Sequence, residues 1–196
     1  MYIAHRINTV AELKNIPTQY GVEIDIRDLG ERLVLHHDPY VDGENLEDFL
    51  RDYQHGTLIL NVKSERIEHR VLELVRKYKI KDYFFLDSTF PMIYLLSNQR
   101  ETNIALRFSE YEGLDTLLSM KGKVKWVWVD CFTKLPINKE NYSKLKEWGY
   151  KLCLVSPELQ GRDQDIEEYK QYLQDNDIKF DKICTKIYNV ERWGNL

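Results

Sequence analysis

Residues 21–27 of the chain read GVEIDIR, and residues 33–39 read LVLHHDP. In the first stretch apolar and charged residues alternate, so a strand would place its aliphatic side chains on one face and Glu23 and Asp25 on the other. The second stretch is a short apolar run that ends at two consecutive histidines. Apolar runs that end in titratable side chains are typical of a buried sheet whose polar groups gather at one edge.

Short apolar runs alternate with segments of helical spacing along the whole chain. The clearest amphipathic segment is 65–80, and Thr89 and Pro91 indicate the start of another helix. Eight strand–helix units predict a small parallel (β/α)8 barrel, a TIM barrel, formed by a single domain over residues 1–196. A doubly wound open sheet is the alternative, although no glycine-rich phosphate loop follows the first run. We expect strands at 2–6, 22–27, 57–64, 83–88, 103–109, 125–132, 151–156 and 180–186, and further helices at 9–16, 45–53, 113–120, 142–148 and 163–175.

Composition narrows the class of protein. With 43% hydrophobic residues in 196, the chain can bury one sizeable core, and its net charge of −4 comes from interspersed acids and bases. No basic block is present that would neutralise a run of phosphates, so we expect no nucleic-acid partner. No apolar stretch approaches about 20 residues and no signal peptide is seen, which predicts a cytoplasmic protein without membrane insertion. Cys131, Cys153 and Cys184 each lie in an apolar run, which predicts reduced, buried thiols.

The two acids on the second strand are the first candidate site. Glu23 and Asp25 are two residues apart on one face, and like charges at that spacing need a cation between them or a raised pKa. Oxygen ligands without cysteine favour a hard ion, Mg²⁺ or Ca²⁺. Such a pair alone is more typical of a solvated strand face. Its combination with histidines at the ends of neighbouring apolar runs favours a functional site.

Other strand ends supply candidates for substrate binding. Arg6 is either a phosphate clamp or an internal ion-pair partner for Glu23. Arg107 ends the fifth run and Trp128 lies in the sixth, so both can reach the edge where the active site of such a barrel lies. A salt-bridge role for Arg107 and a packing role for Trp128 are the alternatives.

The opening of the chain resembles a known family. The residues Ala4-His5-Arg6, the stretch 21–26, Gly30 and the stretch 33–39 are similar, in order and spacing, to the signature of the glycerophosphodiester phosphodiesterase family. That family belongs to a superfamily of barrels that also holds phosphatidylinositol-specific phospholipase C and the spider-venom sphingomyelinases D. The resemblance covers residues 3–39, about a fifth of the chain, and it implies metal-dependent hydrolysis of a phosphodiester.

Individual roles follow from the resemblance. It implies that His5 and His37 are the acid/base couple, and that Glu23 and Asp25 bind the metal ion. These four residues match the family's opening His-Arg, its His-Asp pair and its Glu-x-Asp.

The stretch 58–63, LILNVK, resembles the family's third strand. This alignment implies that Lys63 contacts phosphate, and it places Asn61 where a third metal-binding carboxylate is expected. Because ligand charge tunes the affinity for hard cations, we expect weaker metal binding than in the family. The loop after Arg6 is also shorter than usual and lacks the family's glycine, which leaves the identity of the substrate open.

The sequence therefore predicts a divalent-metal-dependent phosphodiesterase that acts on a small-molecule diester with an alcohol such as glycerol on one side. Two histidines would exchange protons with the attacking and leaving oxygens, a task that suits imidazole near neutral pH. One alternative is a barrel of reduced activity that binds a phosphate-containing ligand, which Asn61 favours. Another is a metal-dependent lyase or aldolase, for which Lys63 is a candidate.

Overall fold

A computed structural model describes residues 1–194. Contacts between Cα atoms divide the chain into two compact units. The N-terminal unit is Ala4–Gln99, and the C-terminal unit is Met1–Ile3 with the chain from Arg100 onward. All the acids and histidines of the predicted site fall in the N-terminal unit.

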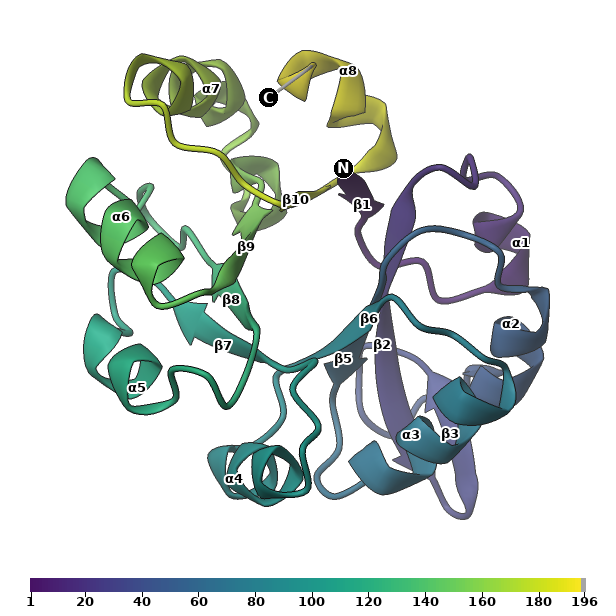
Figure 1. The fold of residues 1–196 in the computed structure, drawn as a ribbon. Helices are drawn as coiled ribbons and strands as arrows, with labels where there is room; N and C mark the ends of the chain where they lie inside the picture. The colour runs from purple at the N-terminus through teal and green to yellow at the C-terminus, as the bar shows by residue number, and fades with distance from the viewer. Residues whose placement is uncertain (195–196) are drawn as a thin grey trace. The chain divides into compact units, whose positions relative to one another are not determined.

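The sheet of the N-terminal unit is arranged around β2 (Gly21–Leu29), the strand that carries the two acids. On one side β2 pairs in parallel with β5 (Leu58–Val62), and β5 pairs in parallel with β6 (Tyr83–Leu86). On its other side β2 pairs antiparallel with β3 (Arg32–Leu35), and β3 pairs antiparallel with β4 (Glu44–Asn45). Figure 1 shows β2 as the long strand of this unit. The first six residues of β2 are buried on both faces, so this is not a surface strand.

Four helices complete the N-terminal unit, and the first two of them have side-chain caps at their N-termini. Thr9 caps α1 (Val10–Leu13) in a capping box with Glu12, and the Asn45 side chain caps α2 (Leu46–Asp52). The amphipathic segment forms α3 (Glu68–Lys77). The last helix, α4 (Phe90–Asn98), begins after Thr89 with a proline in its first turn, as predicted.

The C-terminal unit repeats the strand–helix alternation. Its strands β10, β9, β8 and β7 pair in parallel in that order, and β1 (Tyr2–Ala4) lies next to β10. The bounds of these strands are β7 (Ala105–Phe108), β8 (Trp126–Val129), β9 (Lys151–Val155) and β10 (Lys182–Thr185). The helices are α5 (Leu114–Ser119), α6 (Lys139–Glu147), α7 (Ile166–Asp175) and α8 (Val190–Trp193), with 3-10 turns at Pro157–Gln160, Asp163–Asp165 and Ile187–Asn189.

All eight predicted strands are present, with ends that differ by up to three residues. The hairpin of β3 and β4 was not among them, because an apolar run of only three residues precedes the histidines. The closed ring of a (β/α)8 barrel and the single domain over residues 1–196 stay predictions. The three cysteines are buried thiols outside any disulfide among the described residues, as predicted. Within residues 1–194 no helix has the length and apolar character needed to span a bilayer.

Candidate functional site

The site is built where β2 and β5 run side by side in the N-terminal unit. The parallel register places Asp25 of β2 opposite Asn61 of β5, and Glu23 lies one pleat earlier on the same face of β2. Both acidic side chains are only 1% exposed. Carboxylates that are this deeply buried need hydrogen bonds or counter-charges, because their desolvation is costly.

Glu23 has a partner for each of its oxygens. Its Oε1 accepts a hydrogen bond from Asn61 Nδ2 at 2.7 Å, and its Oε2 accepts one from the backbone N–H of Arg6 at 2.7 Å. The imidazole Nε2 of His5 lies 3.8 Å from Oε2. Burial, together with the nearby charge of Asp25, raises the pKa of Glu23 to about 7.

Asp25 is held by Asn8, a residue that the sequence analysis did not select. Asn8 Nδ2 donates to Asp25 Oδ2 at 2.9 Å, and the backbone N–H of Asp25 donates to Asn8 Oδ1 at 2.8 Å. Two cations lie farther away, with Arg6 Nε 3.4 Å from Oδ2 and Lys63 Nζ 3.7 Å from Oδ1. The side chain of Arg6 is thus an ion-pair partner of Asp25, whereas only its backbone contacts Glu23. Asn8 could have been predicted from the sequence, because its amide lies in the short loop directly after the His-Arg pair.

Lys63 has a second acidic partner, Asp87, which the sequence analysis also missed. The Nζ of Lys63 lies 3.1 Å from Asp87 Oδ2, so the ammonium group lies between Asp25 and Asp87. Asp87 directly follows β6 and has a φ of +59°, and Arg6, which follows β1, has a φ of +57°. Left-handed backbone is costly for residues other than glycine, and such residues are concentrated at functional sites. Asp87 could have been predicted from the sequence, because it is an acidic residue at the end of the strand next to β5.

The donor atoms of this group fit a hard cation. The buried Oδ1 of Asn61 has no hydrogen-bond partner, and it lies on the side chain whose amide nitrogen bonds Glu23. With the carboxylates of Glu23 and Asp25, this amide oxygen makes a set of donors from three residues. The set carries one negative charge fewer than three carboxylates would. Within residues 1–194 no three His, Cys, Asp or Glu side chains are grouped to hold a metal ion.

The described contacts of the His37 side chain are with its sequence neighbour Asp38. Its side chain is 42% exposed, and its Nδ1 is 2.8 Å from a carboxylate oxygen of Asp38. In the part of the chain that the structure describes, the imidazole of His37 has no hydrogen bond or ion pair with His5, Glu23 or Asp25. The structure therefore brings together His5, Arg6, the two acids, Asn61 and Lys63, and the approach of His37 to them stays a prediction.

Arg107 and Trp128 belong to the C-terminal unit. Arg107 forms an ion pair with Asp130, lies 3.8 Å from a carboxylate oxygen of Glu112 and stacks 5.7 Å from the ring centre of Phe132. Trp128 is 5% exposed on β8. Arg107 thus makes the salt bridge, and Trp128 has the buried position, that were the alternatives to substrate binding. Contact of either residue with a substrate stays a prediction.

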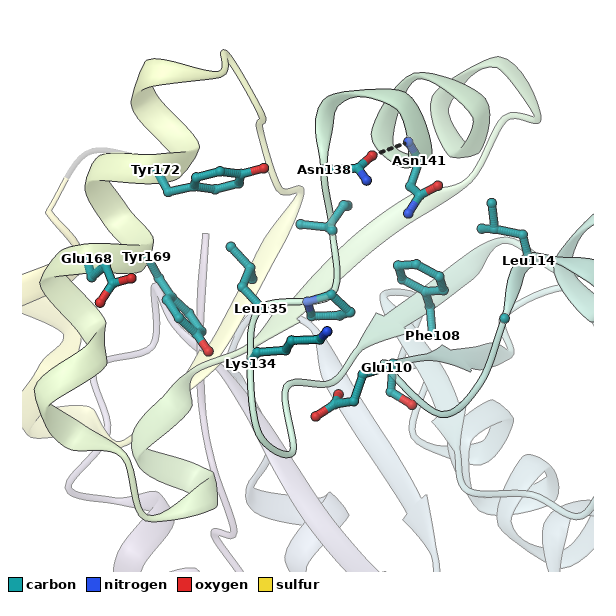
Figure 2. A pocket seen from close by; sticks show the side chains of 14 residues that line it. Phe108, Glu110, Leu114, Lys134, Leu135, Asn138, Asn141, Glu168, Tyr169 and Tyr172 are labelled. Atoms are coloured by element: carbon teal, nitrogen blue, oxygen red, sulfur yellow. Dashed lines mark hydrogen bonds between the residues drawn. The ribbon is translucent and has the colours of Figure 1, made fainter.

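The same unit holds a cavity of about 700 Å³, which Figure 2 shows from close by. Apolar side chains such as Phe108, Leu114 and Tyr172 line it, together with polar groups that include Asn141. No residue predicted for the site is among those that line it. The cavity is therefore a feature separate from the acid and histidine group.

Comparisons with known proteins identify a fold that this chain shares. No protein-family model matches the sequence, and no curated protein matches it either. Among solved structures, the chain is similar to the crystal structure of a glycerophosphodiester phosphodiesterase from Agrobacterium tumefaciens str. C58, with a TM-score of 0.67 and 15% identity. The match covers 93% of this chain and 95% of that chain. At this identity the likeness establishes a shared α/β, TIM-barrel-like fold.

Proposed function

We propose that the chain is a divalent-metal-dependent phosphodiesterase that hydrolyses a small, glycerophosphodiester-like substrate by general acid–base catalysis. One observation carries the proposal: the His5 imidazole lies 3.8 Å from Glu23 in a cluster that also holds Asp25, Asn61 and Lys63. A proton carrier can serve acid–base catalysis, and an ammonium group can stabilise the charge of a phosphoryl group. The fold shared with a glycerophosphodiester phosphodiesterase supports the same assignment.

Charge is the first requirement of the reaction. Glu23, Asp25 and Asn61 are the residues that would hold the ion, which when bound supplies charge neutralisation at the phosphoryl oxygens. Lys63 and Arg6 supply positive charge from the protein itself. The Arg6 side chain is 45% exposed, so its guanidinium group is accessible to an anionic substrate. Both cations also pair with Asp25, which lowers the net attraction of the site for a divalent ion.

Proton transfer is the second requirement. One histidine takes the proton of the attacking hydroxyl, and the other donates a proton to the leaving oxygen. Asp38 accepts a hydrogen bond from Nδ1 of His37, which leaves Nε2 of that ring for the substrate. Because the His37 side chain is 42% exposed, rotation toward a bound diester requires no repacking of the core.

A phosphate-binding barrel of reduced activity is the second candidate. Two observations favour it, since Asn61 supplies an amide where the family has a carboxylate, and His37 does not contact the rest of the group. This protein would bind a phosphate-containing ligand at Lys63 and turn over no diester. The presence of His5 beside the acids favours the enzyme, because a binding site needs no proton carrier there.

The test is hydrolysis of bis(p-nitrophenyl) phosphate and of glycerophosphodiesters after EDTA treatment, with and without Mg²⁺, Mn²⁺ or Ca²⁺. We expect metal-dependent turnover that falls about 100-fold or more in His5→Ala and in His37→Ala. His69→Ala is the control, because His69 is exposed on α3 and bonds only Gln99 in its described contacts. Phosphate binding that depends on Lys63, without turnover of any diester, would support the binding protein instead.

A further inference from the structure

Arg27 is the one basic residue of β2 close to the site, and its contacts are unusual. It directly follows Ile26, which pairs with the last residue of β5, and it lies opposite Val34 of β3. Its Nε donates a hydrogen bond to the backbone carbonyl of His37 at 3.0 Å, and its Nη1 donates to the backbone carbonyl of Lys63 at 2.9 Å. The guanidinium group thus links the chain beyond β3 to the chain beyond β5, the two strands that flank β2.

The link matters because the backbone of His37 has few other supports. The other hydrogen bonds described for residues 37–38 are local. Nδ1 of His36 bonds the backbone of Asp38, and Nδ1 of His37 bonds the carboxylate of Asp38. The last sheet-like bond of this segment is one residue earlier, from the backbone N–H of His36 to the carbonyl of Asp25. Among the described residues, Arg27 is therefore the tie between this backbone and the rest of the sheet.

The chemistry of the side chain suits this task. A guanidinium group is planar and holds its five N–H donors in a fixed fork. Two hydrogen bonds from different edges of the group therefore fix the positions of the two acceptors relative to each other. A lysine ammonium group has no such geometry, and a glutamine has only one short donor group. The half-buried position of Arg27 also limits competition from water for these bonds.

We propose that Arg27 is a positioning residue, which fixes the backbone of His37 relative to that of Lys63 and so sets the spacing between a proton-transferring imidazole and a phosphate-binding ammonium group. The inference rests on the proposed function, since that function gives these two residues their roles. A misplacement of about 1 Å in such a pair can cost about 100-fold in rate. Arg27 itself touches no reacting atom in this scheme.

The test compares Arg27→Ala and Arg27→Lys with wild type, using bis(p-nitrophenyl) phosphate as the probe. We expect kcat to fall about 10- to 100-fold in Arg27→Ala, with a smaller change in KM and an altered pH profile, because the imidazole is no longer held in place. Arg27→Lys should recover little of the loss, and millimolar guanidinium ion should restore part of it in Arg27→Ala. The NMR signals of the His37 ring should shift in both variants.

Arg70→Ala is the matched control, because Arg70 lies in the same unit and its guanidinium also donates to a backbone carbonyl, that of Glu31 in the turn between β2 and β3. It should keep kcat within about twofold of wild type. Unchanged kcat and unchanged His37 signals in Arg27→Ala would overturn the inference. If Arg27→Ala does not fold, Arg27→Lys with wild-type kcat and pH profile overturns it as well. An inactive wild type, by contrast, would count against the proposed function.

Discussion

Without a metal ion, the carboxyl group of Glu23 lies in surroundings that favour its protonated form. Its pKa rises from 4.5 to about 7, so the folded protein binds this proton more tightly than the unfolded chain. The stabilisation is complete below about pH 4.5 and is lost as the pH rises through about 7. We expect the free energy of unfolding in EDTA to fall by about 2 kcal/mol or slightly more between pH 5 and pH 8 on account of this group.

Urea unfolding at several pH values measures this effect, and Glu23→Gln is the informative variant. Glutamine keeps the size of the side chain and removes the titrating group, so the pH dependence should flatten. Wild type and variant with parallel curves would show that the dependence comes from other groups.

In the proposed function, Asn61 is one of the three residues that would hold the ion. Asn61→Glu adds a third carboxylate beside Glu23 and Asp25, and we expect it to tighten Mg²⁺ or Ca²⁺ binding about 10-fold or more, because ligand charge sets the affinity for hard ions. Calorimetric titration measures the change, with Asn15→Glu as the control for a simple change in net charge, because Asn15 is exposed in the turn after α1. Equal affinities in wild type and Asn61→Glu would mean that Asn61 does not face the ion.

Some residues of this site could be predicted from the sequence, and others could not. The spacing of Glu23 and Asp25 on one strand face predicts them as candidates, and the resemblance adds His5, Asn61 and Lys63. The structure brings these five residues together. The partners that hold them were missed for a physical reason. Asn8 contacts Asp25 across 17 residues and Asp87 contacts Lys63 across 24, and such pairs form only when neighbouring strands fix the register.

At the scale of elements, the long parallel strands were predictable and the hairpin of β3 and β4 was not. A fully buried strand shows as a continuous apolar run, as in β5 and β6. In contrast, β4 has two residues and is defined by its pairing with β3, which sequence periodicity cannot reveal. This hairpin bears on the proposed function, because β3 ends two residues before His37.

The hairpin depends on Gly43, and this gives a third prediction. A Cβ atom at position 43 would lie 2.3 Å from the backbone carbonyl oxygen of Leu35, the last residue of β3. We expect Gly43→Ala to lower the free energy of unfolding by about 1–3 kcal/mol, as overpacked sites do, and to reduce phosphodiesterase activity through the displaced His37 backbone. Gly113→Ala is the control, because a Cβ atom there meets nothing within 4 Å. Equal melting temperatures for the two variants would contradict the role given to Gly43.

At the scale of the whole molecule, the strand–helix order that the sequence predicts agrees with the fold shared with a glycerophosphodiester phosphodiesterase over 93% of the chain. Sequence identity of 15% does not carry the activity with it. The proposed function therefore rests on the local group around Glu23, and a bound ion would connect this group to the stability of the folded protein. A ligand that binds only the folded state stabilises it by an amount that rises with its concentration relative to Kd.

This connection predicts a pH-dependent thermal shift. An ion at Glu23 competes with the proton that the raised pKa favours, so binding releases that proton and is weaker at low pH. We expect Ca²⁺ or Mg²⁺ at about 5 mM to raise Tm more at pH 8 than at pH 5.5. In Glu23→Gln the shift should be smaller at pH 8 and nearly independent of pH, whereas His69→Ala should behave as wild type. A shift in wild type that is equal at both pH values would place the ion elsewhere than at Glu23.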